Sequence, residues 1–147
     1  MVSAEGIAHG VKKNSMRFAE GGGFMYTVEV TGRFESAHRL REYKGKCENL
    51  HGHNWKVQVL CSADVLDDIG IVIDFRILKE ALKSITDEID HTYLNENPFL
   101  KGCNPTSENV ARLIFEAMKE RLAAYPAVTV AEVAVWETDS SCARYRN

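Results

Sequence analysis

Residues 46–63 of the 147-residue chain read KCENLHGHNWKVQVLCSA, and from position 51 onward the stretch alternates in the manner of a β-strand. One parity carries mainly apolar side chains and the other carries Asn54, Lys56 and Gln58, which predicts one buried face. The apolar parity also contains His51 and His53. Polar groups on a buried face cost free energy unless they have partners, so these two imidazoles need an explanation.

Three further segments have strand patterns. Residues 26–40, YTVEVTGRFESAHRL, alternate and predict a preceding strand that ends near His38. Residues 127–138, AVTVAEVAVWET, predict a third strand, and residues 142–146, CARYR, predict a short fourth one.

Two helices lie between the second and third strands. Asp74 is a suitable N-cap for a helix through about Ile89, and Thr106 or Ser107 can cap a second helix that opens in PTSEN. The expected apolar positions are Leu78, Leu82, Ile85 and Ile89 in the first helix and Val110, Leu113, Ile114, Ala117 and Leu122 in the second. The order β-β-α-α-β-β indicates an α+β fold in which both helices cover one face of an antiparallel sheet.

Length and composition favour one globular domain with a substantial core. We expect an N-terminal extension over residues 1–25, because GGG at 21–23 separates it from the patterned domain at 26–147. The net charge of −3 disfavours nucleic acid as the main partner. Neither a membrane span nor a secretory signal is present, so we expect a cytoplasmic protein whose four cysteines, which form no CxxC pair, are free thiols.

The strongest chemical signal is the set His38, His51 and His53. A His-x-His pair on a strand projects two imidazoles from one face, and His38 joins them if the first two strands form a hairpin. Three imidazoles without a fourth protein ligand are typical of a catalytic zinc site, whose open position holds water or substrate. The alternative is that these are ordinary core or surface histidines, which is the usual meaning of an isolated His-x-His pair.

Cys47 lies four residues before His51, in a loop that contains Lys44 and Lys46. It could be a fourth zinc ligand, which would make the site structural, in a zinc module without catalytic activity. It could instead be a catalytic thiolate whose pKa is lowered by the metal and the two lysines. Spacing does not separate these possibilities.

Two more positions carry titratable groups with open interpretations. Asp90 and His91 follow the first helix and are either a helix-end feature or a proton carrier tuned by a carboxylate. Glu137 shares the buried parity of the third strand and therefore needs a partner, which is either Arg144 or a ligand with two adjacent N–H donors, such as the amidine edge of a pterin or guanine.

Taken together, these residues resemble the 6-pyruvoyl-tetrahydropterin synthase family. The resemblance runs from about Tyr26 to Tyr145 and is carried by FESAHRL, CENLHGHNW, IVIDF, DHTYLN, PTSENVA and WET in that order. It implies the tunnelling fold (T-fold), a four-stranded antiparallel sheet with two helices on one face. It also implies a homo-oligomeric barrel, with trimers stacked into hexamers and active sites between subunits.

The resemblance also implies a role for each group. Zinc would be bound by His38, His51 and His53; the base would be Cys47; the proton relay would be Asp90 with His91; and the pterin anchor, joined to that relay, would be Glu137. Thr106 and Ser107, within PTSEN, would complete a substrate pocket of a neighbouring subunit. The implied substrate is 7,8-dihydroneopterin triphosphate.

Within the family, the C-x3-H-x-H spacing of Cys47, His51 and His53 resembles the branch that forms 6-carboxytetrahydropterin, acetaldehyde and triphosphate for queuosine synthesis. Glu48 follows the cysteine directly and leaves a second branch open, in which the side chain of dihydroneopterin is cleaved to 6-hydroxymethyl-dihydropterin for folate synthesis. Glu48 would then be a second base that contacts the substrate, and otherwise it is a solvated loop charge. The branch that forms 6-pyruvoyl-tetrahydropterin is a further alternative.

Overall fold

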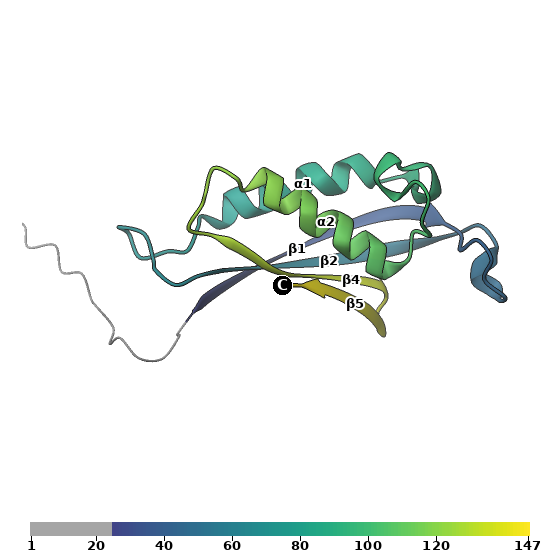
Figure 1. Ribbon diagram of the computed structural model, residues 1–147, viewed down its shortest axis with the longest axis horizontal. Helices are drawn as coiled ribbons and strands as arrows, with labels where there is room; N and C mark the ends of the chain where they lie inside the picture. The colour runs from purple at the N-terminus through teal and green to yellow at the C-terminus, as the bar shows by residue number, and fades with distance from the viewer. Residues whose placement is uncertain (1–24) are drawn as a thin grey trace, which may run out of the picture.

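A sheet forms one layer of the molecule and two helices form the other, in a computed structural model that describes residues 25–147 (Figure 1). The strands are β1 (Tyr26–His38), β2 (His51–Ala63), β3 (Thr92–Tyr93), β4 (Thr129–Thr138) and β5 (Ser141–Arg146), and the helices are α1 (Phe75–Ile89) and α2 (Ser107–Arg121). Short 3₁₀ turns are η1 (Lys46–Glu48), η2 (Leu94–Glu96) and η3 (Pro98–Leu100). The expected extension over residues 1–25 falls, except for Met25, outside the described residues.

The first two strands form the antiparallel hairpin that the alternation predicted. Phe34 lies opposite Trp55 and His38 lies opposite His51 in the register of β1 and β2. Phe34 and Trp55 stack with ring centroids 5.6 Å apart, and Trp55 is completely buried. Because directly opposite residues of an antiparallel pair point to the same side of a sheet, the histidines of both strands lie on the face that forms the core.

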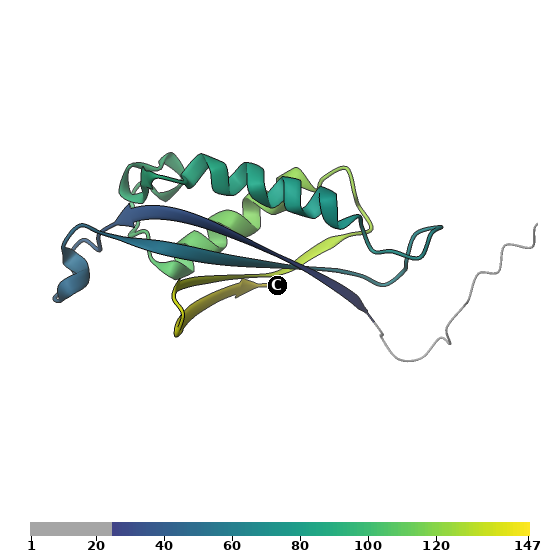
Figure 2. The same ribbon diagram turned by 180° about the vertical axis from the view of Figure 1, so that it is seen from behind.

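Both helices cover this one face, as Figures 1 and 2 show from opposite sides, and the α+β class is confirmed. In α1 the buried apolar residues are the expected Leu78, Leu82, Ile85 and Ile89, and Asp74 caps the helix by accepting from the backbone N–H of Arg76. For α2 the structure decides between the two candidate caps: the side chain of Thr106 accepts from the backbone N–H of Asn109.

The buried face of α2 differs in part from the predicted one. Phe115 and Met118 are buried in the core, whereas Leu113 and Ala117 lie at its margin and are only partly buried. The reason is that α2 packs on β4 and β5, where the rings of Phe115 and Tyr145 lie nearly perpendicular with centroids 5.1 Å apart. Which face of α2 is buried therefore depends on where β4 and β5 lie.

The sheet has one strand more than expected. Its order is β3-β1-β2-β4-β5, and the two-residue β3 pairs parallel with β1 at Ser36 and Ala37, so the sheet is mostly but not wholly antiparallel. Strand β3 lies outside the four segments for which the sequence predicts strands. His91 turns the chain into β3 with a left-handed backbone (φ 54°), a conformation that local sequence signals normally assign to glycine. Among the described residues, no helix is long and apolar enough to cross a membrane.

Candidate metal centre and active site

Four side chains converge where β1, β2 and β4 meet the start of α2. His38, His51, His53 and Glu137 each offer one ligand atom, and these atoms all lie within 4.8 Å of one another. The Nε2 atoms of His38 and His51 are 3.0 Å apart. The hairpin register accounts for the histidine cluster, because it sets His38 opposite His51 and Ser36 opposite His53.

Backbone carbonyls orient two of the imidazoles. Nδ1 of His38 lies 2.8 Å from the carbonyl oxygen of Pro105, and Nδ1 of His51 lies 2.7 Å from that of Asn49. A carbonyl only accepts, so each Nδ1 carries a proton, and Nε2 of each ring faces the cluster. This is the arrangement in which metal-binding histidines are held in proteins.

Glu137 meets the cluster in a way that the sequence did not indicate. Its Oε1 lies 2.9 Å from Nε2 of His38 and 3.0 Å from Nε2 of His53, while its Oε2 accepts a hydrogen bond from the Ser107 hydroxyl at 3.3 Å. Arg144, the candidate protein partner, instead pairs with Glu132 at 2.7 Å. A carboxylate oxygen contacts imidazole nitrogens favourably only through a proton or a cation.

The electrostatics agree with a cation-binding group. Burial lowers the pKa of His53, and the neighbouring imidazoles of His38 and His51 act in the same direction, although Glu137 opposes them. The contact with Nε2 of His38 lowers the pKa of Glu137, although partial burial acts in the opposite direction. Neutral imidazoles beside an ionised carboxylate are the protonation states that a divalent ion requires.

The donor chemistry fits zinc. Imidazole nitrogens and a carboxylate oxygen are ligands of both catalytic and structural zinc sites. Nε2 of His53 is buried and forms no hydrogen bond of acceptable geometry. This nitrogen is therefore available to bind a metal ion. Trp55 packs edge-on against His38 and His53, with centroids 5.0 and 5.4 Å away, and closes the core side of the cluster.

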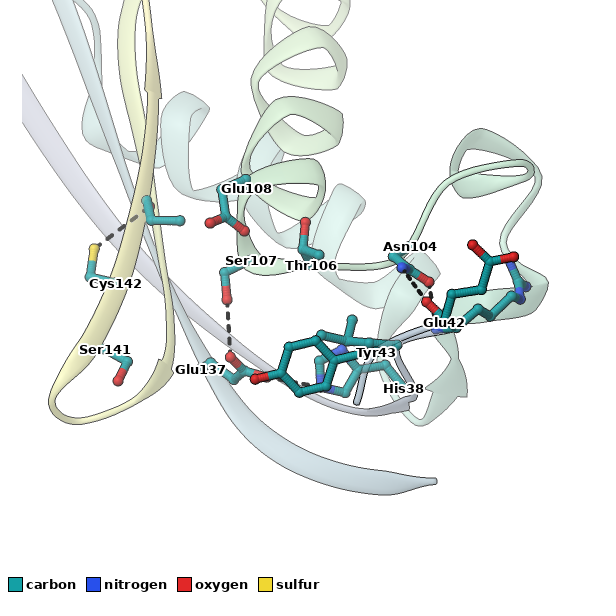
Figure 3. Close-up of a pocket in the computed structure, with 13 residues that line it drawn as sticks. His38, Glu42, Tyr43, Asn104, Thr106, Ser107, Glu108, Glu137, Ser141 and Cys142 are labelled. Carbon is teal, nitrogen blue, oxygen red and sulfur yellow. Dashed lines mark hydrogen bonds and ion pairs between the residues drawn. The ribbon is translucent and has the colours of Figure 1, made fainter. Parts of the chain in front are cut away.

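A cavity of about 490 Å³ opens beside His38 and Glu137 (Figure 3). Thr106 and Ser107, at the start of α2, line it together with the two cluster residues. The resemblance implies that Thr106 and Ser107 complete a substrate pocket of a neighbouring subunit, and in the structure they border the candidate metal site of their own chain.

A second cavity, of about 430 Å³, is lined by His53, His91 and Glu35, among others. Nδ1 of His91 lies 3.0 Å from Oδ2 of Asp90, and Nε2 of His91 lies 3.5 Å from Oε2 of Glu35. Oδ1 of Asp90 accepts from the backbone N–H of Glu35 at 2.7 Å, which lowers the pKa of Asp90. Asp90 and His91 are therefore in contact, as expected, and His91 shares a cavity with His53.

Cys47 and Glu48 lie apart from these groups. Both belong to η1, where Cys47 is half-buried and Glu48 is exposed, and neither lines either cavity. The carbonyl of Cys47 accepts from the backbone N–H of Leu40, at 2.8 Å, and Leu40 lines the first cavity. The cysteine is thus next to the cavity wall without being among the groups that converge on the metal site, which disfavours it as a fourth zinc ligand.

Sequence reasoning missed several contributors to the site. Pro105 supplies a backbone carbonyl, which leaves no side-chain signal, and Glu35 reaches His91 across 56 positions of sequence. Tyr43 also lines the first cavity, and no motif points to it.

Comparisons with known proteins agree with this geometry. Residues 27–147 match the model of the family described as 6-pyruvoyl tetrahydropterin synthase. The chain is 39% identical over 126 residues to a 6-carboxy-5,6,7,8-tetrahydropterin synthase of Synechocystis, in an alignment that covers 82% of this chain and 93% of that protein. It is 36% identical to a 6-pyruvoyl tetrahydrobiopterin synthase of Dictyostelium discoideum, over 82% and 96% of the two chains.

Among solved structures, the 6-pyruvoyl tetrahydropterin synthase of Caenorhabditis elegans superposes with a TM-score of 0.74 at 30% identity, over 84% of this chain and 96% of that chain. The fold and the matched length therefore agree between this chain and its relatives. The chain belongs to the 6-pyruvoyl tetrahydropterin synthase family, whose curated relatives are named as pterin synthases.

Proposed function

We propose that the protein is a zinc-dependent lyase, a 6-carboxy-5,6,7,8-tetrahydropterin synthase that converts 7,8-dihydroneopterin triphosphate to 6-carboxytetrahydropterin, acetaldehyde and triphosphate for queuosine synthesis. The observation that carries the proposal is the convergence of His38, His51 and His53, two of them oriented through Nδ1 by backbone carbonyls. Such a site binds a divalent cation, and the adjoining cavities leave room for a small-molecule substrate.

His38, His51 and His53 would hold the zinc ion. When bound, zinc polarises the substrate's side-chain oxygens and stabilises the negative charge that develops as a carbon-bound proton is removed. A shell of neutral imidazoles keeps the charge of the ion at +2, which favours an alkoxide over a neutral alcohol.

Glu137 would anchor the pterin. Its carboxylate borders the cavity that Thr106 and Ser107 line, and two carboxylate oxygens match the two adjacent N–H donors of the pterin's amidine edge. The resemblance implies that the same carboxylate also joins the proton relay of Asp90 and His91; its own contacts in the structure are with His38 and His53. Ser107 would orient the group through its hydrogen bond to Oε2.

Two groups would move protons. Cys47 would act as the base, because η1 is bonded to the wall of the first cavity at Leu40. His91 would exchange protons from the second cavity, with Asp90 at Nδ1 selecting the tautomer. Cys47 as the base and His91 as the acid would thus approach the substrate's side chain from different sides.

The substrate branch is chosen on the C-x3-H-x-H spacing and on the named relatives, among which both 6-carboxy and 6-pyruvoyl enzymes occur. Glu48 would be the second base in the branch that leads to folate, but its exposed position outside both cavities gives that alternative no support. We further propose a cytoplasmic homohexamer, a dimer of trimers with active sites at subunit interfaces.

The decisive experiment incubates the purified protein with 7,8-dihydroneopterin triphosphate and, separately, with dihydroneopterin, and identifies the products by chromatography and mass spectrometry. Acetaldehyde together with 6-carboxytetrahydropterin from the first reaction would support the proposal. Release of 6-hydroxymethyl-dihydropterin from the second, or of 6-pyruvoyl-tetrahydropterin from the first, would replace it with the corresponding alternative.

Cys47→Ala and Glu48→Ala then assign the base. We expect Cys47→Ala to lower kcat by about a hundredfold or more, because general base catalysis typically contributes that much. Glu48→Ala should leave the rate nearly unchanged. Full formation of 6-carboxytetrahydropterin by Cys47→Ala would contradict the role given to the thiol.

A further inference from the structure

Tyr43 brings a large aromatic surface to the cavity that contains Glu137. Its side chain is 49% exposed, and it lines the same cavity as Ser107 and Glu137 (Figure 3). Most of the other lining side chains are short or polar, and Leu40 is the other large apolar one. A flat heterocycle held at Glu137 therefore has a ring surface available for contact at Tyr43.

The ring of Tyr43 packs directly against the backbone of Gly45. A Cβ atom at Gly45 would lie 2.6 Å from Cε1 of Tyr43, which is closer than such atoms can approach, and 3.3 Å from Cδ1. The backbone of Gly45 is extended (φ 171°), so nothing in its own conformation demands glycine. The missing side chain at position 45 makes room for the ring of Tyr43.

Two asparagine side chains fix the segment that leads to this ring. Asn95 accepts from the backbone N–H of Arg39 and donates to its carbonyl, both at 2.9 Å. Asn104 does the same for Arg41, at 2.7 and 3.0 Å. Each carboxamide thus replaces a neighbouring strand beyond the end of β1, and the chain reaches Tyr43 in a fixed path.

We propose that Tyr43 is a substrate-binding residue whose ring covers the planar ring system of the pterin, and that Gly45 keeps the ring in this position. The inference rests on the proposed function, because it takes the ligand of the cavity to be a pterin. In this proposal the aromatic ring of Tyr43 makes the contact with the pterin, and the hydroxyl group of Tyr43 does not. Removal of such a contact weakens binding about three- to tenfold.

The test measures binding of neopterin, a fluorescent pterin without the triphosphate, to the zinc-loaded full-length protein by fluorescence titration. We expect Tyr43→Ala to raise the Kd about three- to tenfold and Tyr43→Phe to leave it nearly unchanged. Gly45→Ala, which keeps the tyrosine but displaces its ring, should weaken binding as much as Tyr43→Ala. The double variant should be no weaker than either single one. Tyr125→Ala removes a part-exposed tyrosine that lines neither cavity, and serves as the matched control.

The outcomes separate the two proposals. If the unaltered protein does not bind neopterin, the proposed function fails and the inference fails with it. If it binds neopterin but Tyr43→Ala binds equally well, or Tyr43→Phe binds as weakly as Tyr43→Ala, only the role of the ring is overturned. Additive losses in the double variant would overturn the role assigned to Gly45. Circular dichroism of each variant checks that the fold is retained.

Discussion

His91 adopts a left-handed backbone conformation that costs a non-glycine residue roughly 1 kcal/mol or more. Its side chain is 73% exposed and gains little stability from its contacts with Asp90 and Glu35, because exposed ion pairs contribute little. A strained residue that packing does not require suggests a functional role. The proposed proton exchange at His91 supplies one.

We therefore expect His91→Gly to separate stability from activity. Glycine adopts φ 54° without strain, so the free energy of unfolding should rise by about 0.5–1 kcal/mol. Loss of a proton carrier should lower kcat by about a hundredfold or more. Urea unfolding and product formation measure the two effects, and a fully active, stabilised variant would show that His91 is only a helix-end residue.

Under the proposed function Glu137 would be either a fourth zinc ligand or the pterin anchor, and one substitution distinguishes the two roles. Glutamine retains the shape but not the charge, so Glu137→Gln should raise KM and the Kd for neopterin by about tenfold or more. The zinc content should remain that of the unaltered protein, because three histidines still hold the ion. Elemental analysis after dialysis checks this, and loss of zinc would identify Glu137 as a ligand.

The thiol of Cys61 has only a structural role. It is completely buried on β2, and burial raises the pKa of its thiol to about 11, from 9.0. The folded state therefore binds the proton more tightly than the unfolded state. The stabilising contribution is complete below pH 9 and is lost as pH rises toward 11, by roughly 2 to 3 kcal/mol. Urea unfolding at pH 8 and pH 10.5 measures this slope, which Cys61→Val should reduce; an equal slope in both proteins would contradict it.

At the scale of the elements, α2 does two things at once. Its N-terminus delivers Ser107 to Glu137, and the preceding Pro105 carbonyl orients His38. Its body packs Phe115 and Met118 into the core against β4 and β5. Packing of the helix on the sheet thereby positions part of the candidate active site.

The packing of α2 predicts unequal effects for two apolar residues two positions apart. Phe115→Ala should lower the free energy of unfolding by about 3–5 kcal/mol, because it empties a completely enclosed site. Leu113→Ala should cost clearly less, since Leu113 is only partly buried. Urea denaturation of both variants checks the order, and a larger loss for Leu113 would mean that the helix face is assigned wrongly.

At the scale of the whole molecule, the sheet has strand edges without partners in the described part of the chain. β5 pairs only with β4, and residues 26–35 of β1 pair only with β2. Open edges of this length favour pairing with another chain. The proposed assembly would close the edges of neighbouring copies into a continuous barrel.

Light scattering during gel filtration should accordingly give six times the 16.5 kDa mass of the chain. The mass should be independent of concentration over the micromolar range, because an edge-to-edge barrel buries a large interface. A species of 16.5 kDa at all concentrations would contradict the proposed oligomer without affecting the metal centre.

Much of the fold could be predicted because its signals are local. Alternation in β1, β2 and β4 identifies the strands, and the stripe of α1 from Leu78 to Ile89 was predicted correctly. Strand β3 could not be predicted, because it has only two residues and depends on a turn at His91. The buried face of α2 was predicted only in part, because it depends on where β5 lies.

The sequence by itself determined the strand and helix order, the face on which the histidines lie and the candidate ligands, since side-chain periodicity is a property of the backbone geometry. Only the tertiary structure decided that Glu137 meets His38 and His53 and that Tyr43 borders their cavity. Contacts between strands and loops distant in sequence follow from packing and twist, which no local pattern encodes.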